Sequence, residues 1–238
     1  MKNHIKKRYK LSLGFTVIEL LTVIALLAVL AAILIPSVEK ARTNALRAES
    51  ASNLRQVFAA CGLYSNDNNL RLLNSYIGPD EETGRPQGSW CIQLIEGGYL
   101  SDGGVTYGRQ NYEVLGSPIQ RREASDVTID KDPPRYATYG MNAVLAMVRR
   151  DAPLSSAQIS MSRLLAPGRT LYISEGNLPE GKEWFGVSVN PWNLPNNTDG
   201  IVTIVYADGH IGQMQEDELP TQLGKEYSES WYFWKGYK

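Results

Sequence analysis

Few residues of this chain have the types and spacing that chemistry requires, and the first is a carboxylate inside an apolar run. Glu19 is the one charged residue between Gly14 and Pro36. A charged side chain within a membrane-length apolar segment is unfavourable by at least about 2.5 kcal/mol, so such a residue is by default functional. We therefore expect Glu19 to have a partner.

The second candidate is the histidine in the sequence Ala-Asp-Gly-His at residues 207–210. His210 is the single histidine after the first 14 residues, and the chain has no G-x-S-x-G, P-loop or H-E-x-x-H motif. A metal site of His210, Asp208 and Asp199 is one interpretation. The other is a two-residue β-hairpin, because Asp-Gly suits a turn whose two positions both need positive φ. We favour the turn at Asp208 and Gly209 and expect no enzymatic activity.

Acidic side chains near the C-terminus are the remaining candidate metal ligands. Glu216, Asp217 and Glu218 are consecutive, and Asp199 and Asp208 precede them. Carboxylate oxygens are the ligands that calcium prefers. The acidic run is more typical of a solvated stretch, so we expect no cofactor and keep calcium as the alternative.

The element that must position Glu19 is a helix of membrane-spanning length. At about 1.5 Å per residue, residues 15–35 extend roughly 30 Å, which is the thickness of a bilayer core. The 14 residues before them contain five basic residues and no acid: Lys2, Lys6, Lys7, Arg8 and Lys10. Under the positive-inside rule these charges stay cytoplasmic. The rest of the chain is then exported.

Two other interpretations of this segment stay open. A secretory signal has an apolar core of about 7–15 residues before a small-residue cleavage site, which residues 28–31 loosely imitate. The apolar run here is longer than that. An uncleaved signal anchor with an incidental Glu19 is the second interpretation, and Pro36 would then simply bend the helix.

The sequence Gly-Phe-Thr-Val-Ile-Glu at residues 14–19, with its basic leader and apolar helix, resembles the type IV pilin and type II secretion pseudopilin family. The resemblance implies that a prepilin peptidase cleaves between Gly14 and Phe15 and methylates the new amino terminus. It implies that Glu19 pairs with the amino group of a neighbouring subunit during assembly. It also implies that Pro36 marks a kink or locally melted segment that lets subunits pack.

The resemblance gives expectations for partners and location. It implies a polymer with identical or other pilin-like subunits, an inner-membrane assembly platform and a single-pass inner-membrane protein. The N-terminus would be cytoplasmic and the globular domain periplasmic before assembly into a pseudopilus or pilus. Removing the leader leaves 19 basic and 25 acidic residues, a formal charge of −6. We therefore expect no nucleic-acid partner.

The sequence at residues 207–210 resembles a second feature, found near the C-terminus of a large pseudopilin-like group. Similar fixed points are Tyr-Gly-Met-Asn at 139–142 and Pro-Gly-Arg-Thr-Leu at 167–171. The chain departs from the group at Thr198, where a His is usual, so the role of that His does not transfer. Some pseudopilins hold calcium in a C-terminal loop.

The coarse pattern predicts an α+β fold, in which a long N-terminal helix packs on an antiparallel sheet as in pilins. We expect a leader at 1–14, a transmembrane helix at 15–35, an amphipathic continuation at 36–65 and a globular domain at 66–238. Helices are expected at 89–96 and 141–150, and strands at 170–174, 185–189 and 201–207. The apolar face of the continuation should comprise Val38, Ala41, Ala45, Ala48, Leu54, Val57, Cys61 and Tyr64.

Two further features leave alternatives open. Cys61 and Cys91 form a possible disulfide in an oxidising compartment, but Cys61 also falls on the apolar helix face as a small hydrophobe. Five aromatic residues lie within the last eight. We expect a final strand or tail that completes the core, and the alternative is an exposed platform for polysaccharide. The function classes are thus a pilin-like structural subunit, a displayed binding module and, third, a tethered enzyme.

Overall fold

The computed structural model describes residues 15–73, 90–100, 113–119, 138–145, 159–176, 188–192, 194–195, 197 and 199–237. Backbone contacts divide the chain into two compact units, Met1–Asn44 and Ala45–Lys238. The second unit therefore includes residues 45–67 of the long helix as well as the sheet.

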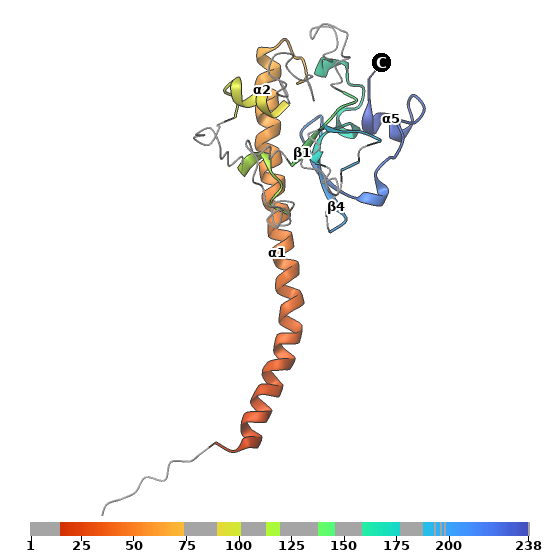
Figure 1. Ribbon diagram of the computed structural model, residues 1–238. Coiled ribbons are helices and arrows are strands. Elements are labelled where there is room, and N and C mark those ends of the chain that lie inside the picture. Colours follow the sequence, from red (N-terminus) through yellow and green to blue (C-terminus); the bar gives the residue numbers. More distant parts are fainter. Residues whose placement is uncertain are drawn as a thin grey trace, which may run out of the picture. The chain divides into compact units, whose positions relative to one another are not determined.

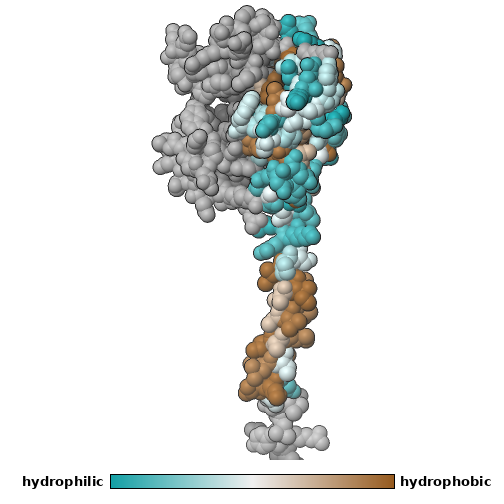
Figure 2. Space-filling view, turned by 90° about the vertical axis from the view of Figure 1, so that its right-hand side faces the viewer, coloured by the Kyte–Doolittle hydropathy of each residue, from teal (hydrophilic) through white to brown (hydrophobic). Residues whose placement is uncertain are grey.

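The first unit is built on the N-terminal part of α1, an α-helix over Val17–Asp67 that continues through Pro36. Every large apolar side chain from Phe15 to Val38 is exposed. Figure 2 shows the apolar surface that they form along this part of the helix. Among the described residues, α1 is the one helix long and apolar enough to cross a membrane. The expected long N-terminal helix is confirmed.

The second unit contains a five-stranded sheet in the order β3-β1-β2-β4-β5. Neighbouring strands are antiparallel except β3, which is parallel to β1. The strands are β1 (Tyr139–Asn142), β2 (Leu171–Glu175), β3 (Ser188–Val189), β4 (Ile201–Tyr206) and β5 (Ile211–Gln215). The predicted strands at 170–174 and 201–207 are confirmed to within a residue. Of the strand predicted at 185–189, residues 188–189 form β3, and 185–187 lie outside the described residues.

Short helices complete the second unit. They are α2 (Trp90–Glu96), α5 (Glu229–Trp234) and the 3-10 turns η1 (Glu113–Leu115), η2 (Met161–Arg163), η3 (Pro167–Arg169) and η4 (Glu216–Glu218). The helix predicted at 89–96 is confirmed as α2. The helix predicted at 141–150 is wrong at its start, because Met141 pairs with Ile173 of β2. Residues 146–150 lie outside the described part, and the error shows tertiary pairing overriding a local helical pattern.

The sheet is covered on both faces, as successive side chains of a strand point to opposite sides. One core cluster joins Leu54, Val57 and Cys61 of α1 to the sheet, where its members include Tyr139, Met141, Ile173 and Val205. The other joins Leu171, Val202 and Ile204 to Phe233 and Trp234 of α5. Figure 1 shows α1 on one side of the strands and α5 on the other.

The packing face of α1 begins later than the periodicity predicted. Leu54, Val57 and Cys61 are buried and Tyr64 is partly buried, but Val38, Ala41, Ala45 and Ala48 are exposed. The first fully buried side chain of the helix is Ser50. Helical spacing marks which side of a helix is apolar, and the position of the sheet decides how much of that side is covered.

The aromatic C-terminus forms a helix rather than the expected strand or tail. Ser228 caps α5 by accepting a hydrogen bond from the backbone N–H of Trp231. Trp231, Phe233 and Trp234 are buried, and the Trp234 indole N–H donates to the carbonyl oxygen of Pro220 at 2.8 Å. These three rings complete the core, so they do not form an exposed platform.

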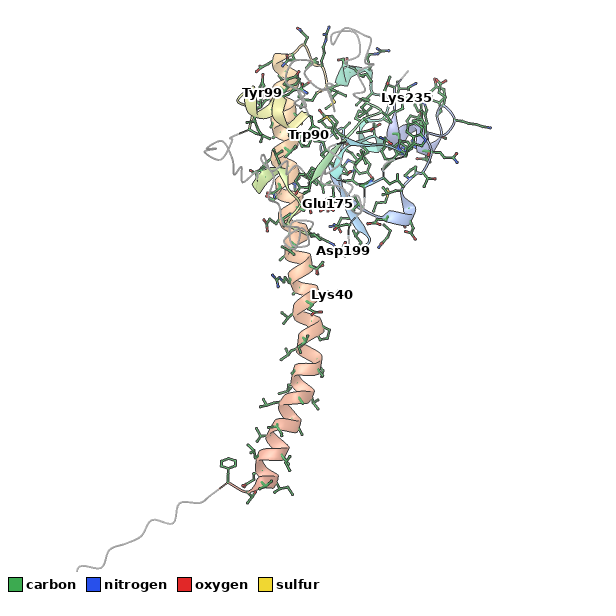
Figure 3. The ribbon with its side chains drawn as sticks, viewed as in Figure 1. Lys40, Trp90, Tyr99, Glu175, Asp199 and Lys235 are labelled. Carbon is green, nitrogen blue, oxygen red and sulfur yellow. The ribbon has the colours of Figure 1, made fainter. Side chains whose placement is uncertain are left out.

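A carboxylate at the end of β2 ties the layers together. Glu175 is completely buried. Its Oε1 accepts hydrogen bonds from Ser50 Oγ of α1 at 2.8 Å and Ser117 Oγ at 2.7 Å. Its Oε2 accepts from the Thr203 backbone N–H of β4 at 2.9 Å and Asn197 Nδ2 at 3.1 Å. Four segments that are distant in the sequence therefore meet at one side chain, which Figure 3 labels between α1 and the sheet.

The charge of Glu175 is opposed by its surroundings. Burial raises the pKa of this carboxyl, and the four hydrogen bonds only partly counter that effect. No described Lys, Arg or His side chain forms a hydrogen bond or ion pair with Glu175. The protonated form is favoured more in the folded protein than in the unfolded chain. The native state is therefore relatively most stable below the ordinary Glu pKa and loses that advantage as pH rises through the raised value.

We predict that Glu175→Gln keeps the fold and becomes more stable relative to wild type as pH rises from 4.5. The Gln carbonyl can accept from Thr203 and Asn197, and its amide can donate to the two serine hydroxyls, whose protons rotate. Glu175→Ala should instead cost at least about 3 kcal/mol, because several buried donors lose their acceptor at about 1–3 kcal/mol each. Chemical denaturation in detergent from pH 4.5 to 8 measures both. If the difference in unfolding free energy between wild type and Glu175→Gln stayed constant over this pH range, the assigned direction of the Glu175 pKa shift would be contradicted.

Candidate functional site

The start of α1 is organised by Thr16 and Glu19. The Thr16 backbone N–H and Oγ1 both donate to Glu19 Oε2 at 2.8 Å, and the Glu19 N–H donates to Thr16 Oγ1 at 3.2 Å. This reciprocal pair is a capping box, which satisfies backbone N–H groups that an N-terminal turn otherwise leaves unpaired. The partner expected for Glu19 is therefore found in part within its own chain.

The capping box is worth more in a membrane than in water. An unsatisfied backbone group in hydrocarbon costs several kcal/mol, and a negative charge at a helix N-terminus is stabilised by the helix dipole. Both bonds from Thr16 go to Oε2. Within the described part of the chain, Glu19 Oε1 accepts no hydrogen bond. The carboxylate therefore has one oxygen without a donor among the described residues.

The other residues expected at this site are Gly14, Phe15 and Pro36. Phe15 precedes the helix and is 81% exposed, and Gly14 lies outside the described residues. Pro36 lies inside the continuous helix. Its ring nitrogen cannot donate to the carbonyl of Ala32, so one helical hydrogen bond is missing there. The local melting that the family resemblance implies remains a prediction.

The hairpin between β4 and β5 differs from the predicted two-residue turn. The Gly209 N–H donates to the Tyr206 carbonyl at 2.8 Å, and the Tyr206 N–H donates to His210 O at 3.0 Å. The loop thus has three residues, of which Gly209 alone has positive φ, at +90°. A turn followed by a left-handed Gly is the next common hairpin type. A Cβ on Gly209 would lie 2.5 Å from Phe58 of α1, so helix packing selects this turn.

His210 belongs to a small half-exposed cluster. Its Nδ1 lies 2.6 Å from Asp208 Oδ1, which also accepts the His210 backbone N–H, and its ring stacks on Tyr206 with centroids 4.2 Å apart. Burial raises the pKa of Asp208, but the bonds from His210 outweigh it and the net pKa is lowered. A Cβ on Gly168 would lie 2.8 Å from Asp208 Oδ2. These contacts assign Asp208 and His210 to bracing the turn.

The weak calcium candidates are held by separate partners. Asp199 Oδ2 forms a mostly buried ion pair with Arg47 of α1 at 2.7 Å, Asp208 contacts His210, and Glu216 accepts from the Asn197 backbone N–H. Asp217 is exposed. Across the described ranges, no group of three or more His, Cys, Asp or Glu side chains is arranged to hold a metal ion. Thr198 lies outside the described residues.

The two cysteines are buried in the core cluster that α1 forms with the sheet, and they are not joined in a disulfide. Burial raises the pKa of the Cys61 thiol to about 12. Because the thiolate is the reactive form, Cys61 is an inert hydrophobe at neutral pH.

Two polar contacts of the second unit escaped the sequence analysis, namely the Glu175 cluster and the ion pair of Arg47 with Asp199. Glu175 follows four residues of an apolar strand, Leu-Tyr-Ile-Ser. A charge at the end of such a run is a signal that it has buried partners. Arg47 carried no comparable signal. In the sequence it cannot be distinguished from the charged residues of an ordinary solvent-exposed helix face.

No family model, no curated protein and no solved structure matches this chain.

Proposed function

We propose that this protein is a structural subunit of the pseudopilin or minor pilin kind. It would be cleaved by a prepilin peptidase and polymerise through its N-terminal helix in a type II secretion or type IV pilus-like machine. The observation that carries the proposal is the first turn of α1. There a carboxylate lies at the start of a membrane-length apolar helix and has one oxygen without a described donor.

The helix is better suited to assembly than to simple anchoring. About 20 apolar residues suffice to span a bilayer, but α1 is 51 residues long and its last third forms part of the domain core. Helix association in lipid needs packing and polar contacts, because burial of apolar surface gives no driving force there. The exposed apolar side chains from Phe15 to Val38 supply the packing surface, and Glu19 supplies the polar contact.

Cleavage after Gly14 would create a donor for Glu19 Oε1. The new ammonium group would belong to Phe15, one residue before the cap residue Thr16. Within one chain, Thr16 already occupies Glu19 Oε2. The ammonium of a neighbouring chain would bond Oε1 and neutralise the carboxylate in a medium of low dielectric. Assembly would then offset part of the cost of the lone charge.

We predict that the mature protein begins at Phe15 with a methylated amine. Expression with a prepilin peptidase should yield this mass in intact-protein mass spectrometry. Gly14→Arg should abolish cleavage, because the charged side chain occupies the position next to the cut bond. An intact leader on the wild-type protein, with the peptidase shown to process another substrate, would refute the family assignment.

We also predict that Glu19→Val inserts into the membrane at least as well as wild type but lowers fibre yield at least about tenfold, which corresponds to about 1.4 kcal/mol. Fibre yield is measured by shearing and sedimentation with the assembly machinery present, and insertion by carbonate extraction. Thr22→Val is the matched control. It replaces a polar residue one turn away, whose hydroxyl donates only to the Glu19 carbonyl at 2.9 Å, and should leave the yield unchanged. Fibres of Glu19→Val at the wild-type yield would exclude the pairing role.

A further inference from the structure

A strained tyrosine stands before α5. The Ser228 N–H donates to the Lys225 carbonyl at 2.9 Å, which closes a turn over residues 225–228. Tyr227 is the third residue of this turn and has a φ of +65°. Gly or Asn is the ordinary choice at such a position, because the left-handed conformation is costly for a bulky side chain. Something other than the backbone therefore favours Tyr here.

Packing of the Tyr227 ring against the buried Trp231 accounts for this choice only in part. The Tyr227 side chain is 47% exposed, although its ring lies near those of Trp231 and Tyr232, with centroids 5.3 and 6.4 Å apart. The loop is fixed to α5 by the Ser228 cap and by Ser230 Oγ, which donates to the Gln222 carbonyl at 2.6 Å. A strained residue that is held rigidly and left exposed is a candidate for function.

The neighbours of Tyr227 make a surface with both aromatic and polar groups. The Arg169 guanidinium lies over the Tyr232 ring, 4.4 Å from its centroid, and pairs with Glu229. Arg169 and Glu229 are 46% and 87% exposed. We call Tyr227, Tyr232, Arg169 and Glu229 the aromatic patch. It presents the half-exposed Tyr227 ring beside a hydrogen-bond donor and an acceptor.

The aromatic patch lies on the side of the sheet that α1 does not cover. Helix α5 packs on the face that carries Leu171, Val202 and Ile204, whereas α1 packs on the opposite face. Figure 3 shows Lys235, at the end of α5, on the far side of the strands from α1. The part of α1 that packs on the sheet therefore does not cover this surface.

We propose that the aromatic patch binds the pyranose rings of a neutral polysaccharide. A pyranose presents an apolar C–H face that packs on an aromatic ring, and hydroxyl groups at its edge that bond a guanidinium and a carboxylate. Arg169 and Glu229 neutralise each other, so the surface favours a neutral chain over a charged one. The buried rings of Trp231, Phe233 and Trp234 support the surface without taking part in it.

The test is isothermal titration calorimetry on the unassembled full chain in detergent micelles. The probes are hexasaccharides of β-1,4-glucan, β-1,4-mannan and α-1,4-glucan. We expect at least one to bind, and Tyr227→Gly to weaken that binding at least tenfold without lowering the melting temperature, because Gly relieves the strained φ. Glu229→Gln should also weaken binding, and its exposure makes an effect on folding negligible.

Trp192→Ala is the matched control, because Trp192 is an aromatic side chain 78% exposed in the β3–β4 connection. It should bind like wild type. The proposal is overturned if wild type binds none of the probes, if Tyr227→Gly or Glu229→Gln binds as wild type does, or if Trp192→Ala abolishes binding. Since assembly is not required for the measurement, failure here leaves the proposed subunit role untouched, and failure of fibre formation leaves the patch untouched.

Discussion

The buried carboxylate of Glu175 is the constraint on which the globular unit depends. A carboxylate without water must find donors, and Glu175 finds them on α1, on β4 and on two connections. Each of those elements is thereby fixed relative to the end of β2. The ion pair of Arg47 with Asp199 joins α1 directly to the β3–β4 connection, less than one helical turn before Ser50. Polar contacts therefore set where on the helix the sheet packs, and apolar contacts supply most of the burial around them.

The same helix has two parts with different surfaces. Its N-terminal part carries apolar side chains that are exposed on every side, and from Ser50 onward its side chains enter the domain core. Helix α1 has no break between these parts. The assembly contact that we propose for Glu19 would thus be made by the element that also completes the fold of the globular unit. Truncating this helix past Ser50 would remove a Glu175 donor as well as core side chains.

The face of the sheet opposite α1 is covered by α5. Phe233 and Trp234 of α5 complete the core cluster on this face. The loop before α5 contains the strained, half-exposed Tyr227. The 3-10 turn η3 connects two surface features. Gly168 approaches Asp208 of the hairpin, and Arg169 lies over Tyr232. The hairpin that looked like the second functional site is thus a brace, and the surface beside it carries the proposed ligand contacts.

The sequence determined what depends on local pattern: the apolar helix, Glu19 near its start, α2, β2 and β4. Spacing alone specified the capping box, because a Thr three residues before a Glu can satisfy the first turn without help from elsewhere. Tertiary structure decided the rest. Met141 joined a strand because β2 offered a partner, and Gly209 took a three-residue loop because Phe58 packs against it. Full burial on α1 begins only at Ser50, which helical spacing could not fix. Glu175 and Arg47 gained their partners from positions 22 to 152 residues away, and no local pattern encodes such a meeting.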